Sequence, residues 1–161
     1  MKPRKILVPL DGSSVAEIAL PEAVDLARGG AALVLLRAAE PVRLPAADPT
    51  ERQVEVVRDA ETYLDAVAAW ARKAGVTEIE TSVWYAPAAE AIIEAARVRD
   101  VDLIVMASHG RSGLGRLVLG SVAESVLRGT TTPILLLRDS QAPPMSVTLD
   151  EARTLAEPID V

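Results

Sequence analysis

The residues best suited to chemistry lie in one stretch of the chain, from Leu103 to Val122, where an apolar run leads into a loop rich in glycine and arginine. The loop glycines are Gly110, Gly113 and Gly115. Their spacing lets the backbone turn sharply and bring its N–H groups close to an anion. Arg111 and Arg116 add positive charge with no acid between them, in a chain whose net charge is -6. A small polyanion is the ligand that this local reversal of charge favours.

The end of the same stretch predicts a helix start that faces the anion. Gly120 and Ser121 open this helix, and Ser121 and Glu124 have the spacing of a capping box. Free N–H groups at such a start bind phosphate. A simpler interpretation stays open, in which the glycines form only a long connection and the arginines are solvated. The pattern is neither a Walker loop nor a G-x-G-x-x-G turn that opens a helix directly.

The elements that must position this loop alternate along the chain. Short apolar runs predict strands, and N-cap residues followed by apolar periodicity predict helices. The expected strands are 5–10, 31–38, 78–84, 102–108 and 133–138, and the expected helices are 14–28, 49–74, 88–98 and 121–128. Capping boxes are expected at Ser14 with Glu17 and at Ser121 with Glu124. The alternation predicts an α/β fold, a doubly wound parallel five-stranded sheet with helices on both faces and the order 3-2-1-4-5.

In that order the winding reverses between the first and fourth strands, where such sheets bind ligands. Asp11 follows the first strand, and the glycine loop follows the fourth, so both should face one crevice. The Asp11 carboxylate can accept hydrogen bonds from a ribose hydroxyl or an adenine amine. Asp11 can equally be a turn residue that stabilises its own backbone.

Composition limits the classes of function. With 161 residues, half of them hydrophobic, the chain fits one domain over 1–138 and a tail over 139–161. Its acidic charge excludes an extended nucleic-acid-binding or membrane-surface face. No apolar run reaches membrane-spanning or signal-peptide length, so we expect a cytoplasmic protein. The chain has one histidine, no cysteine and no second acid beside Asp11, and therefore no clear catalytic pair.

From residue 5 to 138 the sequence resembles the universal stress protein family, most strongly in ILVPLDGS, DLIVMASHGRSGL and LGSVAESVLRGTTTPILLLR. The nucleotide-binding branch of that family carries Gly, two residues, Gly, nine residues, then Gly and Ser or Thr. Gly110, the nine residues 111–119, and Gly120 with Ser121 match this pattern, whereas Ala107 stands at the first glycine. A methyl group there matters only where positive φ or direct ligand contact is needed.

The resemblance implies a Rossmann-like fold of the adenine nucleotide alpha hydrolase type, with ATP, with or without Mg²⁺, as ligand. The implied nucleotide-binding residues are Pro9, Leu10, Asp11, Ala38, Met106, Ala107, His109, Gly110, Arg111, Gly120, Ser121 and Val122. Such a protein would be a nucleotide-dependent stress or regulatory switch rather than a dedicated enzyme. The alternatives left open are a scaffold of the same fold without nucleotide, a slow ATP hydrolase and, less favoured, an ATP-using ligase or electron-transfer subunit.

The fifth strand predicts a homodimer. It is apolar without alternation, although the expected order places it at an edge of the sheet, where an uncovered strand risks aggregation. The residues concerned are Pro133, Ile134, Leu135, Leu136 and Leu137. Pairing with the same edge of a second copy would give a closed two-fold contact. The chain's own tail folding back is the alternative cover.

Overall fold

The computed structural model describes residues 2–40, 48–108 and 119–138. These residues form a five-stranded parallel sheet in the order β3-β2-β1-β4-β5, which confirms the predicted order. The strands are β1 (Lys5–Pro9), β2 (Ala32–Ala38), β3 (Ile79–Trp84), β4 (Leu103–Ser108) and β5 (Ile134–Arg138). The helices are α1 (Ser14–Glu17), α2 (Ala19–Ala27), α3 (Pro49–Lys73), α4 (Ala88–Val98) and α5 (Ser121–Gly129).

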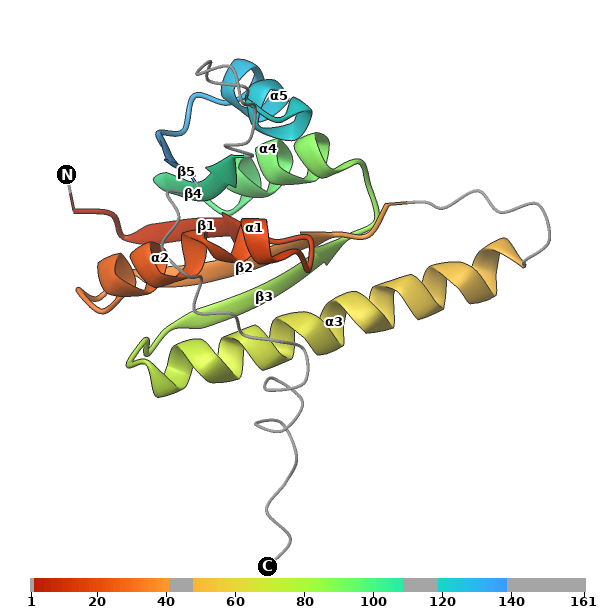
Figure 1. Cartoon of the computed structure of the whole chain (residues 1–161), viewed down its shortest axis with the longest axis horizontal. Helices are drawn as coiled ribbons and strands as arrows, with labels where there is room; N and C mark the ends of the chain where they lie inside the picture. Colours follow the sequence, from red (N-terminus) through yellow and green to blue (C-terminus); the bar gives the residue numbers. More distant parts are fainter. Residues whose placement is uncertain (1, 41–47, 109–118, 139–161) are drawn as a thin grey trace, which may run out of the picture.

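Helices cover both faces of the sheet (Figure 1). Successive side chains of a strand point to opposite faces, so each central strand contributes to two cores. Ile6 and Val8 of β1 pack with α2 and α3. Leu7, which lies between them, packs with α4 and α5. Because both faces are covered, the central strands are continuous apolar runs rather than alternating ones.

The long helix α3 begins and ends where local chemistry predicts. The Asp48 carboxylate accepts the backbone N–H groups of Thr50 and Glu51, and Pro49 stands in the first turn. Gly75, at φ +100°, follows its last turn. The buried residues of α3 begin only at Ala60, and the amino-terminal half of the helix extends past the sheet (Figure 1). The carboxyl-terminal half therefore anchors α3 in the core.

The expected single helix over 14–28 is wrong, because the structure has two helices, α1 and α2, with a break at Ile18. Pro21 has no N–H to donate to the carbonyl of Glu17, which removes one bond of a continuous helix. The predicted capping box of Ser14 with Glu17 is also wrong. Ser13 is the N-cap and accepts the N–H of Ala16 at 3.2 Å. Either serine can serve as a cap, and the turn that precedes α1 selects the earlier one.

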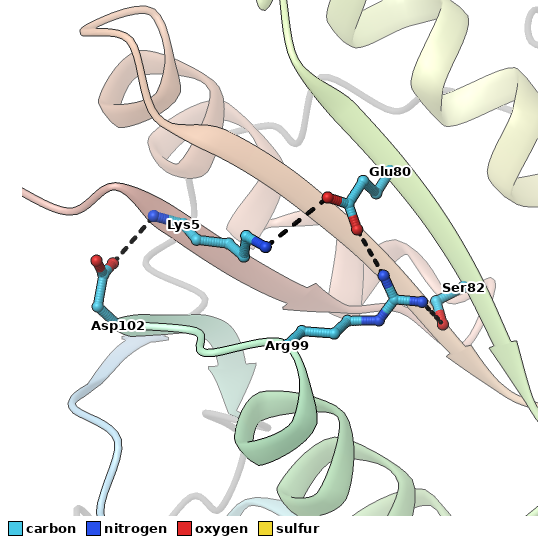
Figure 2. A network of polar contacts seen from close by, with 5 residues as sticks. All are labelled: Lys5, Glu80, Ser82, Arg99 and Asp102. Atoms are coloured by element: carbon cyan, nitrogen blue, oxygen red, sulfur yellow. Dashed lines mark hydrogen bonds and ion pairs between the residues drawn. The ribbon is translucent and has the colours of Figure 1, made fainter.

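A polar network ties β1, β3 and the end of α4 together (Figure 2). Arg99, which follows α4, reaches Glu80 at 2.5 Å and the Ser82 hydroxyl at 3.1 Å, both on β3. The Lys5 ammonium lies 3.8 Å from the other oxygen of Glu80. Asp102 accepts the backbone N–H of Lys5 at 3.1 Å. The network supplies polar partners along a part of edge strand β3 where apolar side chains are few.

Within the described residues, no helix combines the length and the apolar character that a bilayer crossing requires.

Candidate functional site

A cavity of about 630 Å³ opens at the carboxyl ends of β1, β2 and β4. We call it the carboxyl-edge pocket. Its walls come from the ends of these strands, the turn before α1, the starts of α4 and α5, and Val56 of α3. The pocket straddles the point between β1 and β4 where the winding of the sheet reverses. This is the place where open parallel sheets bind small molecules.

Most of the predicted binding residues lie around this one cavity. The predicted residues that line it are Pro9, Leu10, Asp11, Ala38, Met106, Ala107, Gly120, Ser121 and Val122. The other three, His109, Gly110 and Arg111, lie outside the described residues. The fold thus brings together side chains from four separate segments of the chain.

Asp11 takes the simpler of its two predicted roles and keeps capacity for the other. Its Oδ1 accepts the N–H of Ser13 at 2.8 Å, which closes the turn between β1 and α1. Gly12, within that turn, has φ +83°, a conformation that favours glycine. Asp11 is exposed and lines the pocket, and each carboxylate oxygen accepts more than one hydrogen bond. The carboxylate can therefore hold the turn and still accept a donor from a ligand.

The start of α5 differs from the expected capping box. Gly120 is the N-cap, without a side-chain cap, and Ser121 is the first helical residue. The Glu124 carboxylate instead accepts a hydrogen bond from the Arg128 guanidinium, one turn later on the helix, at 2.8 Å. Gly120 and Ser121 both line the pocket, so the N–H groups of the first helical turn lie at its wall. Unbonded N–H groups with a positive helix end suit an anionic ligand group.

Ala107, which stands at the first glycine of the family pattern, lies in β4 and lines the pocket. Among the described residues other than glycine, only Asp100 has a positive φ. The Ala107 methyl group therefore causes no backbone strain. Its cost is limited to the small volume that it takes from the pocket.

Two charged residues of the pocket were missed by the sequence reasoning, Arg37 and Glu40. Glu40 accepts the backbone N–H of Ala88 at 3.0 Å and so stabilises the start of α4. Arg37 is the one charged residue within the apolar run of β2, and that contrast was a usable signal. Glu40 carried no comparable local signal, because it follows the strand in an ordinary polar connection.

A buried carboxyl group lies next to the pocket. Glu17 is 5% exposed, and its Oε1 accepts the Tyr63 hydroxyl at 2.8 Å. Burial raises the pKa of Glu17; the Tyr63 hydrogen bond opposes this rise, and the charge of Asp11 adds to it. Burial and the hydrogen bond to Glu17 likewise raise the pKa of Tyr63. Among the described residues no three His, Cys, Asp or Glu side chains are grouped as metal ligands.

Comparisons with known proteins agree with this architecture. Residues 2–138 match the model of the universal stress protein family. The chain is 34% identical over 140 residues to the universal stress protein MJ0531 of Methanocaldococcus jannaschii, covering 84% of this chain and 82% of that protein.

Solved structures show the same fold. Universal stress protein UspA from Lactobacillus plantarum superposes with a TM-score of 0.73 at 24% identity, covering 86% of this chain and 99% of that one. A universal stress protein in complex with cAMP superposes with a TM-score of 0.64 at 26% identity, covering 85% and 98%. The sheet order, the position of the pocket and the match over residues 2–138 together show that the chain belongs to the universal stress protein family.

Proposed function

We propose that the carboxyl-edge pocket binds an adenine nucleotide, ATP, with or without Mg²⁺. The phosphates would lie at the start of α5 and the nucleoside near Asp11 and Ala38. The observation that carries this proposal is the pocket itself, because residues that the family resemblance implies converge on one cavity of about 630 Å³. That volume lies within the usual range for small-molecule sites. The related structure that holds cAMP supports an adenine-containing ligand.

The same proposal describes the protein as a cytoplasmic, dimeric regulator whose conformation or partner choice depends on bound nucleotide, rather than as a dedicated enzyme.

The first test of the proposal is which nucleotide the protein binds. Asp11 can accept a hydrogen bond from the amino group of adenine, whereas guanine carries an acceptor oxygen at that position. We therefore expect calorimetric titration of the purified protein to show tighter binding of ATP than of GTP. Absence of heat or of a thermal shift with millimolar ATP would favour the nucleotide-free scaffold.

Gly120→Val tests whether the start of α5 is the phosphate site. The branched side chain adds bulk at the pocket wall and blocks close approach to the helix N–H groups, so affinity for ATP should fall at least tenfold. Gly120 has φ -60°, a conformation open to valine, so the fold should survive.

Ser125→Val is the matched control, because Ser125 is exposed on the same helix and is not a lining residue. Circular dichroism and titration of both variants complete the comparison. A folded Gly120→Val protein that binds ATP as the wild type does would show that the phosphate group lies elsewhere.

A further inference from the structure

The Arg37 side chain lies at the pocket against the Tyr63 ring. Its guanidinium carbon lies 4.9 Å from the centre of the Tyr63 ring, a cation–π distance. Gly12 lies nearby, since an added Cβ there would lie 3.4 Å from an Arg37 guanidinium nitrogen. Because Gly12 has no side chain, it leaves room for the Arg37 guanidinium. The contact with Tyr63 restricts a side chain that would otherwise be mobile.

The Tyr63 ring that contacts Arg37 is itself fixed by burial and by a hydrogen bond. Tyr63 is 3% exposed, and its hydroxyl donates to the buried carboxyl group of Glu17. A side chain with its ring packed in the core and its hydroxyl bonded has little rotational freedom. Glu17 and Tyr63 therefore act as positioning residues for Arg37. Such a second layer of support is typical of groups that must meet a ligand at one place.

The charged residues that line the pocket differ in whether they have a hydrogen-bond partner among the described residues. Asp11 accepts the N–H of Ser13, and Glu40 accepts the N–H of Ala88. Within the described part of the chain, Arg37 takes part in no ion pair or hydrogen bond, and it is the one cation among the lining residues. The guanidinium carries five N–H donors and no acceptor, so a partner must supply acceptor atoms. The pocket is where such a partner can lie.

Position decides which part of a nucleotide Arg37 meets. Neighbouring strands are about 4.8 Å apart, so the ends of β2 and β4, which flank β1, are separated by about 10 Å. Arg37 packs with Tyr63 on the face covered by α2 and α3, whereas α5 lies on the opposite face. A nucleotide with its phosphates at the start of α5 would therefore bring its nucleoside toward Arg37.

We propose that Arg37 is a specificity residue that donates hydrogen bonds to acceptor atoms of the nucleoside, held for this task by Tyr63 and Glu17. The inference rests on the proposed nucleotide site and adds a residue that recognises the nucleoside of the bound nucleotide. The acceptor atoms are ring nitrogens of the base or hydroxyl oxygens of the ribose. Arg37 contributes by directed hydrogen bonds rather than by general attraction for phosphate, and this distinction can be measured.

The test compares Arg37→Met and Arg37→Lys with the wild type, by titration with ATP and with AMP. Arg37→Met should lower the affinity for both nucleotides by the same factor, about tenfold, because ATP and AMP share one nucleoside. Arg37→Lys keeps the charge but loses the planar fork, so it should also lose several-fold for both. Comparing AMP with 2′-deoxy-AMP then separates a ribose hydroxyl from a base nitrogen as the acceptor.

Other outcomes overturn the inference. A loss for ATP that clearly exceeds the loss for AMP, with Arg37→Lys like the wild type, would mean that Arg37 acts only through its charge on the phosphates. Unchanged affinities in Arg37→Met would mean that it does not meet the ligand. Arg72→Met is the matched control, since Arg72 is an exposed cation of α3 outside the lining. A wild type that binds neither nucleotide would refute the proposed function itself, and this inference with it.

Discussion

At the scale of single residues, the buried carboxyl group of Glu17 makes stability depend on pH. Its pKa is raised in the folded protein, mainly by burial, so the folded state keeps the proton to higher pH than the unfolded chain. Stability from the protonated form is fully present below the unfolded pKa, about 4.3, and is lost as pH rises through the folded pKa. Glu17→Gln stays neutral throughout. The variant should therefore gain stability relative to the wild type as pH rises above about 4.3.

Urea denaturation across a pH series measures this difference. Glu22→Gln is the control for the loss of one carboxyl group, because Glu22 is exposed on the neighbouring helix α2. Parallel profiles for Glu17→Gln and the wild type would contradict the proposed burial of a titrating carboxyl group. Tyr63→Phe in the same series should cost about 1–3 kcal/mol, because it leaves Glu17 buried without its donor.

At the scale of elements, Arg99 joins the end of α4 to β3 through Glu80 and the buried Ser82 (Figure 2). Arg99→Met should lower the free energy of unfolding by about 1–2 kcal/mol, since Ser82 loses a charged donor and Glu80 loses its close partner. Nucleotide binding should not change, because none of these residues lines the pocket. Chemical denaturation and ATP titration of one preparation measure both effects.

Arg97→Met provides the matched control within α4. Among the described residues, Arg97 forms an ion pair only with Glu94, one turn earlier on the same exposed helix face, where solvent screens the pair. Its loss should therefore change the free energy of unfolding less than the loss of Arg99 does. Equal losses in the free energy of unfolding for Arg97→Met and Arg99→Met would mean that the contacts of Arg99 with β3 stabilise the protein no more than an exposed ion pair does.

At the scale of the whole molecule, β5 is an edge strand that pairs with β4 on one side. Its side chains from Ile134 to Leu137 are half-buried on both faces, so the described residues cover its apolar surface only in part. We expect a homodimer in which two copies of β5 pair edge to edge. Leu136→Lys should then yield monomers or insoluble protein, as measured by light scattering alongside circular dichroism.

Val54→Lys is the control for an added charge, because Val54 is 48% exposed on α3, away from β5. It should remain dimeric. An unchanged dimer in Leu136→Lys, or a monomeric wild type at micromolar concentration, would rule out pairing through β5. A chain shortened to residue 138 tests the alternative cover: if the tail shields the edge, removing it should turn a monomer into a dimer.

Local chemistry determined much of the fold. Apolar runs bounded by glycine, proline and acidic residues predicted all five strands to within about one residue, and Asp48 with Pro49 predicted the start of α3. These features act between residues close in the chain, so a sequence pattern contains them. The motif residues near the ends of β1 and β4 were predictable for a related reason, because the alternation of strands and helices places such ends at one edge of the sheet.

Only the tertiary structure decided which groups meet Arg37. The Tyr63 ring comes from the middle of α3, and Gly12 comes from the turn after β1. Glu17 comes from the short helix α1, which the prediction from the sequence joined with α2 in one helix. Their contacts depend on how α1 and α3 settle on the sheet, and side-chain packing between distant segments sets that arrangement. The choice of Ser13 over Ser14 as N-cap has the same origin: both satisfy the local rule, and the path of the chain out of β1 selects between them.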